Sequence, residues 1–279
     1  MSDRLTEVRS EIARLQSEHK LREVEPLLRE SVELTGEQKG ETSREYVAEL
    51  NELGSLLRAL KELDESEAAF VQAAAIEAAA RGKDNADYAT TINNLAGTYR
   101  LKGDFDKAES LFGEAIEIYR ERVGTEHFTY LSALNNLGLV YQDQKKYREA
   151  EALHLEALAA LEREGKQGVV RATTLNNLAS AAMATGRYDE AHSYFAETLG
   201  IYEHSEGKTS VLYLTGLNNL AVLDYLRGDL SAAERGFVQV LEIIETVLGK
   251  DHPDWAKAAK HLAMTREKLG SSSPSSAEG

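Results

Sequence analysis

Two kinds of residue in this sequence have side chains suited to chemistry: its histidines and a repeated series of asparagines. The seven histidines are His19, His127, His154, His192, His204, His252 and His261. They form none of the closely spaced pairs of zinc hydrolases, and the chain has no phosphate loop and no nucleophile elbow. Cysteine is absent, which excludes thiolate metal sites and cysteine nucleophiles. We interpret the chain as a non-enzyme without a cofactor; a metal site assembled from distant repeats is the weaker alternative.

The asparagines occur in pairs at a nearly constant spacing. The pairs are Asn93-Asn94, Asn135-Asn136, Asn176-Asn177 and Asn218-Asn219, separated by 42, 41 and 42 residues. Asn51 lies 42 residues before the first pair and is followed by glutamate. An amide side chain is both a donor and an acceptor, so a row of amides can bind the main chain of an extended peptide. Alternatively, the amides join successive repeats to one another, and the spacing leaves both interpretations open.

The elements that must position these asparagines are paired helices, repeated every 42 residues. In one copy four apolar residues recur at helical spacing and define a buried stripe: Ile92, Leu95, Ala96 and Tyr99. Gly103 is suited to end this first helix, and Asp104 is suited to cap the second. A single hairpin cannot bury both of its faces, so stability must come from stacking against neighbouring hairpins.

The register of the repeat predicts the organisation of the whole chain. We expect about thirteen helices in an all-α solenoid. Residues 1–45 form an N-terminal hairpin that is a diverged repeat or cap, and 46–255 form five units of about 42 residues. A capping helix is predicted over 256–270 and a disordered polar tail over 271–279.

A few positions depart from the repeat. His154 stands where the sister repeat has Phe112, and Ser66 stands where it has Ala108. Asp224 replaces the tyrosine of the apolar stripe, and a carboxylate there would be partly buried. We favour a rotated or locally solvated helix end at Asp224 over a binding role.

The order small–Tyr–Gly–aromatic–Ala–Phe–Ala within each hairpin resembles that of the tetratricopeptide repeat. The 42-residue period, the LNNLA segments and the loop GKDHPDW (249–255) resemble the subtype found in kinesin light chains and many bacterial proteins. The resemblance covers residues 46–270 and implies a right-handed superhelix whose first helices line the concave face. Ordinary repeats have a proline near the end of the second helix; because this chain has none there, we expect that helix to run about two turns longer.

Opposite the apolar stripe, the first helices present a mostly uncharged wall, which is the predicted peptide-binding groove. The wall residues are Asn51, Thr90, Asn93, Arg100, Asn135, Leu139, Gln142, Thr173, Asn176, Met183, Thr215, Asn218, Val222 and Tyr225. Pockets beside the four larger apolar or aromatic members would supply specificity. Resemblance to kinesin light chains favours the first asparagine of each pair as the ligand-binding one. The carboxylate clamp of chaperone-binding relatives is not reproduced, because the basic residues are too scattered.

Charge and hydropathy restrict the partners. The formal net charge of −15 makes nucleic acid and anionic membranes poor partners. No apolar stretch approaches the roughly 20 residues of a membrane span, and the charged start of the chain is unlike a signal peptide, so we expect a cytoplasmic protein. The leading hypothesis is an adaptor that binds an extended peptide or a partner helix. The alternatives are a peptide- or ligand-responsive regulatory sensor and a self-assembling array whose exposed ends form a homo-oligomer.

Overall fold

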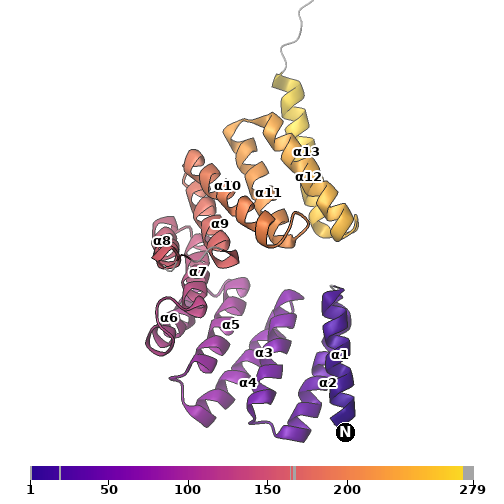
Figure 1. The fold of residues 1–279 in the computed structure, drawn as a ribbon, viewed down its shortest axis with the longest axis vertical. Helices are drawn as coiled ribbons and strands as arrows, with labels where there is room; N and C mark the ends of the chain where they lie inside the picture. The colour runs from indigo at the N-terminus through magenta and orange to yellow at the C-terminus, as the bar shows by residue number, and fades with distance from the viewer. Residues whose placement is uncertain (1, 19, 164, 166–167, 273–279) are drawn as a thin grey trace, which may run out of the picture. The chain divides into compact units, whose positions relative to one another are not determined.

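A computed structural model describes residues 2–18, 20–163, 165 and 168–272 of the chain, and all regular secondary structure in these residues is α-helix (Figure 1). The thirteen helices of this described part are α1 (Ser2–Ser17), α2 (Leu21–Lys39), α3 (Arg44–Ala59), α4 (Leu63–Arg81), α5 (Ala86–Lys102), α6 (Phe105–Arg122), α7 (Phe128–Asp143), α8 (Tyr147–Arg163), α9 (Val169–Ala184), α10 (Tyr188–Ser205), α11 (Val211–Arg227), α12 (Leu230–Val247) and α13 (Pro253–Ser272). The prediction of an all-α chain of about thirteen helices is confirmed.

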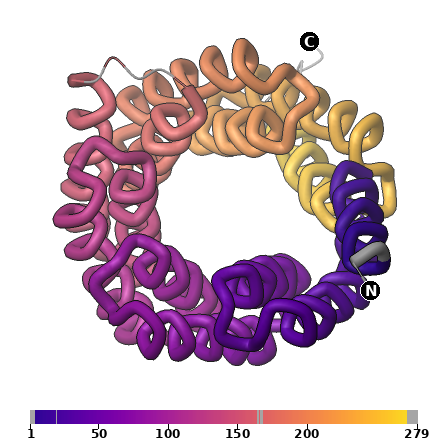
Figure 2. The backbone as a smooth tube through the Cα atoms, turned by 60° about the horizontal axis from the view of Figure 1, so that its bottom comes forward, coloured from indigo at the N-terminus to yellow at the C-terminus, as the bar shows by residue number. Residues whose placement is uncertain are grey.

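The helices divide into two compact units. Unit 1 is Met1–Gln144 and contains α1 to α7; unit 2 is Lys145–Gly279 and contains α8 to α13. Within each unit every helix packs against the next one along the chain. First helices also contact one another, α3 with α5 and α5 with α7 in unit 1, and α9 with α11 and α11 with α13 in unit 2. Second helices make no such contacts within the described ranges, so each unit has two layers and curves toward its first helices (Figure 2).

Helix lengths agree with an uninterrupted second helix. The second helices α4, α6, α10 and α12 have 18 or 19 residues, whereas the first helices α3, α5, α7, α9 and α11 have 16 or 17. No proline lies inside these nine helices. Pro26 is inside α2, the second helix of the N-terminal hairpin, and Pro253 is the first residue of α13, where its fixed backbone angle favours a helix start.

The turn inside each hairpin requires a left-handed residue at one position. Gly103 takes this conformation with φ of 79°, which confirms its predicted role in ending α5. Asp104 then caps α6 by accepting a hydrogen bond from the backbone N–H of Lys107, as predicted. At the equivalent position, Lys61 and Lys145 adopt φ of 68° and 61°. A side chain raises the energy of this conformation, so these two hairpins carry strain that a glycine avoids.

The core follows the predicted stripe. All four of its residues in α5 are buried: Ile92, Leu95, Ala96 and Tyr99. Four second helices contribute a fully buried phenylalanine at one repeat position, namely Phe70, Phe112, Phe195 and Phe237. His154 takes this position in α8 and is 0% exposed. Ser66, at the position of a buried alanine, donates to the carbonyl oxygen of Gly54 at 2.8 Å, which satisfies its hydroxyl.

Both ends of the described chain continue the helical packing. The N-terminal hairpin of α1 and α2 shares an apolar cluster with α3, and Arg9 Nε donates to Glu49 Oε1 at 3.0 Å. At the other end, α13 extends through Ser272, two residues past the predicted end. Ser271 is helical, and its hydroxyl donates to the carbonyl oxygen of Glu267 at 3.0 Å. The rest of the predicted tail, 273–279, lies outside the described residues.

Candidate binding surface of the first helices

All predicted wall residues lie on first helices, and most remain partly accessible. Thr90 and Thr215 are exposed, whereas Asn135 is 4% exposed and therefore buried. The half-buried members in unit 1 are Asn51, Asn93, Arg100, Leu139 and Gln142. Those in unit 2 are Thr173, Asn176, Met183, Asn218, Val222 and Tyr225. Each unit thus presents amides on its first-helix face, and Asn135 contributes least to the accessible part of it.

The paired asparagines bond across successive repeats. Asn136 Nδ2 donates to Asn93 Oδ1 at 3.5 Å in unit 1, and Asn219 Nδ2 donates to Asn176 Oδ1 at 3.1 Å in unit 2. The second asparagine of one repeat therefore holds the first asparagine of the previous repeat. This joining role was one of the two interpretations of the spacing. The bonds use the oxygen of the first asparagine rather than its Nδ2 donor, so joining repeats and binding a ligand are compatible.

The arginines of the first helices interact within unit 1. Arg58 Nη1 donates to the carbonyl oxygen of Asn94 at 2.9 Å, and burial together with the nearby charge of Arg100 lowers the pKa of Arg58. Gly97 provides the space, since a Cβ there would lie 2.6 Å from Arg58 Nη1. Arg100 Nη1 pairs with Asp143 Oδ2 at 2.8 Å. These contacts leave the wall without a convergent basic cluster.

Two cavities open between successive first helices, and we call them seam pockets. The α3–α5 seam pocket has a volume of about 520 Å³, and the α11–α13 seam pocket has a volume of about 500 Å³. The first is lined by Arg44, Glu45, Val47, Ala48, Asn51, Glu77, Arg81, Asp87, Thr90 and Thr91. The second is lined by Val211, Leu214, Thr215, Asn218, Val240, Ile244, Leu248, His252, Asp254, Lys257, Ala258 and His261. All lining positions of the first except Glu45 recur in the second at the equivalent place four repeats later.

The α3–α5 seam pocket is charged. Glu77 is only 2% exposed and accepts from Arg81 through both carboxylate oxygens, with Nε to Oε2 at 3.0 Å. Asp87 pairs with Arg44 at the rim. Asn51 donates to Thr91 Oγ1 at 3.0 Å, while its buried Oδ1 has no hydrogen-bond partner. An acceptor of this kind can take an N–H group from a ligand.

The α11–α13 seam pocket is largely apolar at its floor. Leu214, Val240 and Ile244 are buried there, and Asn218 presents its amide at the side. His261 Nδ1 is buried without a hydrogen-bond partner. The two seam pockets therefore share a place in the repeat and differ in chemistry.

At the repeat position of Glu77 and Ile244, two other repeats have a buried tyrosine and α8 has buried Leu161. Tyr119 is 2% exposed and its hydroxyl donates to Thr90 Oγ1 at 2.9 Å, between α6 and α5. Tyr202 is 3% exposed, and its hydroxyl oxygen lies 3.2 Å from Thr173 Oγ1, between α10 and α9. Burial raises the pKa of both tyrosines, so both hydroxyls stay protonated. The tyrosines occupy the repeat position of Glu77 and Ile244.

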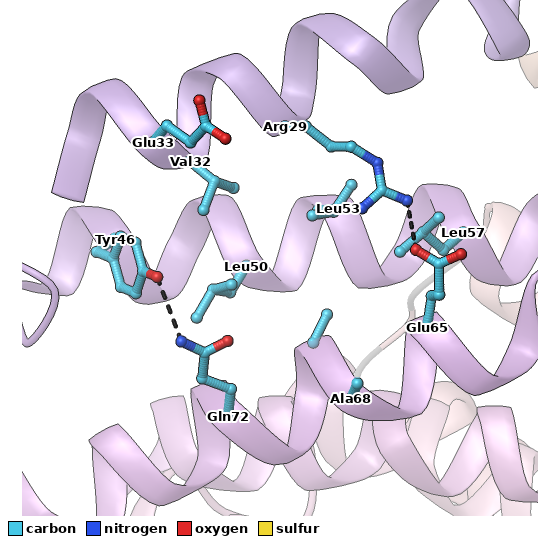
Figure 3. A pocket seen from close by; sticks show the side chains of 11 residues that line it. Arg29, Val32, Glu33, Tyr46, Leu50, Leu53, Leu57, Glu65, Ala68 and Gln72 are labelled. Carbon is cyan, nitrogen blue, oxygen red and sulfur yellow. Dashed lines mark hydrogen bonds and ion pairs between the residues drawn. The ribbon is translucent and has the colours of Figure 1, made fainter.

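Two further cavities flank the seams. A small one of about 120 Å³ is lined by Val222, Tyr225, Phe237, His261 and Met264, so a pocket does lie beside two of the predicted specificity residues. A larger one of about 310 Å³ lies on the second-helix side of unit 1 (Figure 3). Its floor includes Leu50 and Leu53, and Arg29 bridges its rim to Glu65 at 2.6 Å. Sequence reasoning missed this cavity, although Ala69 stands where the next repeat has Leu111.

In the described part of the chain no three histidine, aspartate or glutamate side chains are placed to hold a metal ion. No helix there combines the length and the apolar character that a membrane crossing requires.

Comparisons with known proteins concern the repeat and the fold. The family model described as tetratricopeptide repeat matches residues 46–121, 93–163, 129–204 and 170–244. No curated protein matches the chain.

Solved structures share the fold at low identity. BtubC (BKLC) from P. vanneervenii is 22% identical with a TM-score of 0.64, over 85% of this chain and 93% of that one. A putative kinesin light chain with nearly identical repeats from Podosopora anserina is 21% identical with a TM-score of 0.60, over 74% and 97%. The apo form of RapI is 16% identical with a TM-score of 0.61, over 96% and 99%. Together with the family model, which spans more than half of the sequence, these likenesses show that the chain belongs to the tetratricopeptide repeat family.

Proposed function

We propose that the chain is a protein-interaction scaffold that binds an extended peptide on the first-helix faces of its units. The observation that carries the proposal is the pair of seam pockets, each of about 500 Å³, which open between first helices that bear amides. Catalysis needs convergent acids, bases or nucleophiles, whereas Glu77 and Asp87 of the α3–α5 seam pocket are held in ion pairs with arginines.

Main-chain recognition is the mechanism that this surface supports best. Asn93 and Asn176 are half-buried, so their orientation is restrained by packing and by the bond from the next repeat. An extended peptide exposes a carbonyl and an N–H at every residue, and oriented amides can bind both. Side chains of the peptide would then enter the seam pockets, which supply specificity through their different chemistry.

The test compares two double variants in binding to peptides selected from a displayed random library, measured by isothermal titration. Asn93→Ala with Asn176→Ala removes wall amides, whereas Asn136→Ala with Asn219→Ala removes the same inter-repeat bonds and keeps those wall amides. We expect the first pair to weaken binding by about tenfold or more and the second pair to have a smaller effect. Equal losses would assign the asparagines to repeat packing, and unchanged affinity in the first pair would refute the binding face.

A second candidate is a regulator whose activity depends on a bound peptide. The observation in its favour is the similarity to RapI in its apo form, which extends over 96% of this chain. Small-angle scattering with and without a selected peptide separates the two functions, because a sensor changes its scattering profile and a passive scaffold does not. Light scattering on the same samples tests self-association of the array ends.

A further inference from the structure

The side chain that fills a seam in two repeats is missing in another. Tyr119 and Tyr202 occupy their own seams, whereas the α11–α13 seam has Ile244 at that position and an open volume of about 500 Å³. We propose that the α11–α13 seam pocket binds the tyrosine side chain of a peptide ligand. The geometry of the repeat supports the pocket itself, and only the assignment of the tyrosine to a peptide rests on the proposed function.

The filled seams show how this fold accommodates a phenol. The ring of Tyr119 is buried between the second and first helices of its hairpin, and its hydroxyl donates to Thr90 Oγ1 at 2.9 Å. Tyr202 repeats the arrangement with Thr173 at 3.2 Å. A buried ring with a threonine oxygen at its polar end is therefore an arrangement that the chain itself uses twice.

The open seam retains the threonine that contacts the phenol elsewhere. Thr215 stands at the repeat position of Thr90 and Thr173 and lines the pocket. Its hydroxyl donates to the carbonyl oxygen of Val211 at 2.8 Å, as that of Thr90 donates within its own helix, so the oxygen of Thr215 can accept a further hydrogen bond. Leu214 and Val240 are buried apolar residues at positions where the tyrosine repeats have smaller side chains, namely Ala89, Ala172, Ala115 and Thr198. The space offered to a ligand is therefore the open volume of about 500 Å³ itself.

The α3–α5 seam pocket provides the internal contrast. It has a similar volume, but the position of the tyrosine is taken by Glu77, which is buried against Arg81. An uncharged ring placed there would disrupt a buried ion pair, and this is costly. Selectivity between the two seams for a phenol therefore follows from two repeat positions, because the α3–α5 seam has Glu77 in place of Ile244 and Ala48 in place of Thr215.

The experiment uses the full chain with ¹³C-labelled methyl groups of isoleucine, leucine and valine, titrated with N-acetyl-tyrosinamide and observed by NMR. We expect concentration-dependent shifts of the methyl signals of Ile244, Leu214 and Val240, with Ile12 in the N-terminal hairpin unchanged. N-acetyl-alaninamide should leave all of these signals in place, because it has no ring to bury. Absence of shifts at the three pocket residues would overturn the proposal.

Two variants test whether the repeat position decides occupancy. Ile244→Tyr places the chain's own ring in the seam, and we expect the affinity for the probe to fall by about tenfold or more. Tyr119→Ile opens a sister seam, and we expect the new methyl group at position 119 to shift with the probe. Circular dichroism checks that both variants fold, and Tyr119→Ile remains as the test if Ile244→Tyr does not fold. Probe shifts that persist unchanged in folded Ile244→Tyr would overturn the proposal.

The outcomes separate the pocket from the proposed function. If the amide binds the seam and no peptide binds the chain, the pocket stands and the scaffold function fails. If selected peptides bind with equal affinity to the wild type and to Ile244→Tyr, the scaffold function stands and the tyrosine pocket fails.

Discussion

Replacing His154 by phenylalanine tests whether a buried histidine makes the fold sensitive to acid. His154 occupies a position where four sister repeats have a buried phenylalanine, and burial lowers its pKa from 6.5 to about 4. The folded state therefore keeps the imidazole neutral, whereas the unfolded chain binds a proton as the pH falls below 6.5. The stability that the neutral group allows is fully present above pH 6.5 and is lost progressively down to about pH 4.

The magnitude follows from the difference between the two pKa values. Each pKa unit corresponds to about 1.36 kcal/mol, so the wild type should lose about 3 kcal/mol of unfolding free energy from this group across that range. Urea unfolding followed by circular dichroism at several pH values between 7.5 and 4.5 measures the loss. Other groups titrate in the same range, so the quantity to compare is the difference between the wild type and His154→Phe, which should widen as the pH falls.

The reverse substitution in another repeat tests the same effect. Phe112→His places an imidazole at the same buried position of an earlier repeat, and we expect it to introduce a similar acid sensitivity. The reasoning is refuted if the stability of His154→Phe and that of the wild type run parallel from pH 7.5 to 4.5. A parallel course would mean that the pKa of His154 is the same in the folded and the unfolded chain.

Three further substitutions probe the turn, the core and the charged seam by urea unfolding at neutral pH. Lys61→Gly relieves a left-handed residue and should stabilise the chain by about 1 kcal/mol; a destabilised variant would contradict the strain. Gly54→Ala places a Cβ 2.9 Å from the ring of Phe70 and should cost about 1–3 kcal/mol, so an unchanged midpoint would show that the ring can move. Arg81→Ala removes the bidentate partner of buried Glu77 and should cost about 3 kcal/mol, so an unchanged midpoint would show that the carboxylate finds another partner.

Much of the fold was predictable because the spacing of apolar residues along each helix indicates which face is buried. The stripe of Leu95 and Tyr99, the glycine at Gly103 and the cap at Asp104 are local signals, and local packing realises them directly. The repetition of these signals in five copies then sets the order of the helices.

The seam pockets were not predictable in the same way. Helical-wheel reasoning assigned the binding wall to first helices, whereas Glu77, Tyr119 and Ile244 belong to second helices and reach the wall only through the packing of the hairpin. The burial of Asn135, beside half-buried equivalents in sister repeats, is likewise invisible in a sequence where the repeats look alike. Variation among glutamate, tyrosine, leucine and isoleucine at one repeat position is the sequence signal that could have pointed to the seams.

The repeat position of Glu77, Tyr119 and Ile244 also affects how such a chain can change over evolutionary time. A mutation there alters the charge or the volume available between two first helices, while the caps, the phenylalanine core and the asparagine bonds of the hairpin stay as they are. Stability in a stacked array depends on nearest neighbours, so the cost of the change stays local. Each repeat can therefore acquire or lose a preference for a ligand side chain through a single codon, independently of the other repeats and without rebuilding the scaffold.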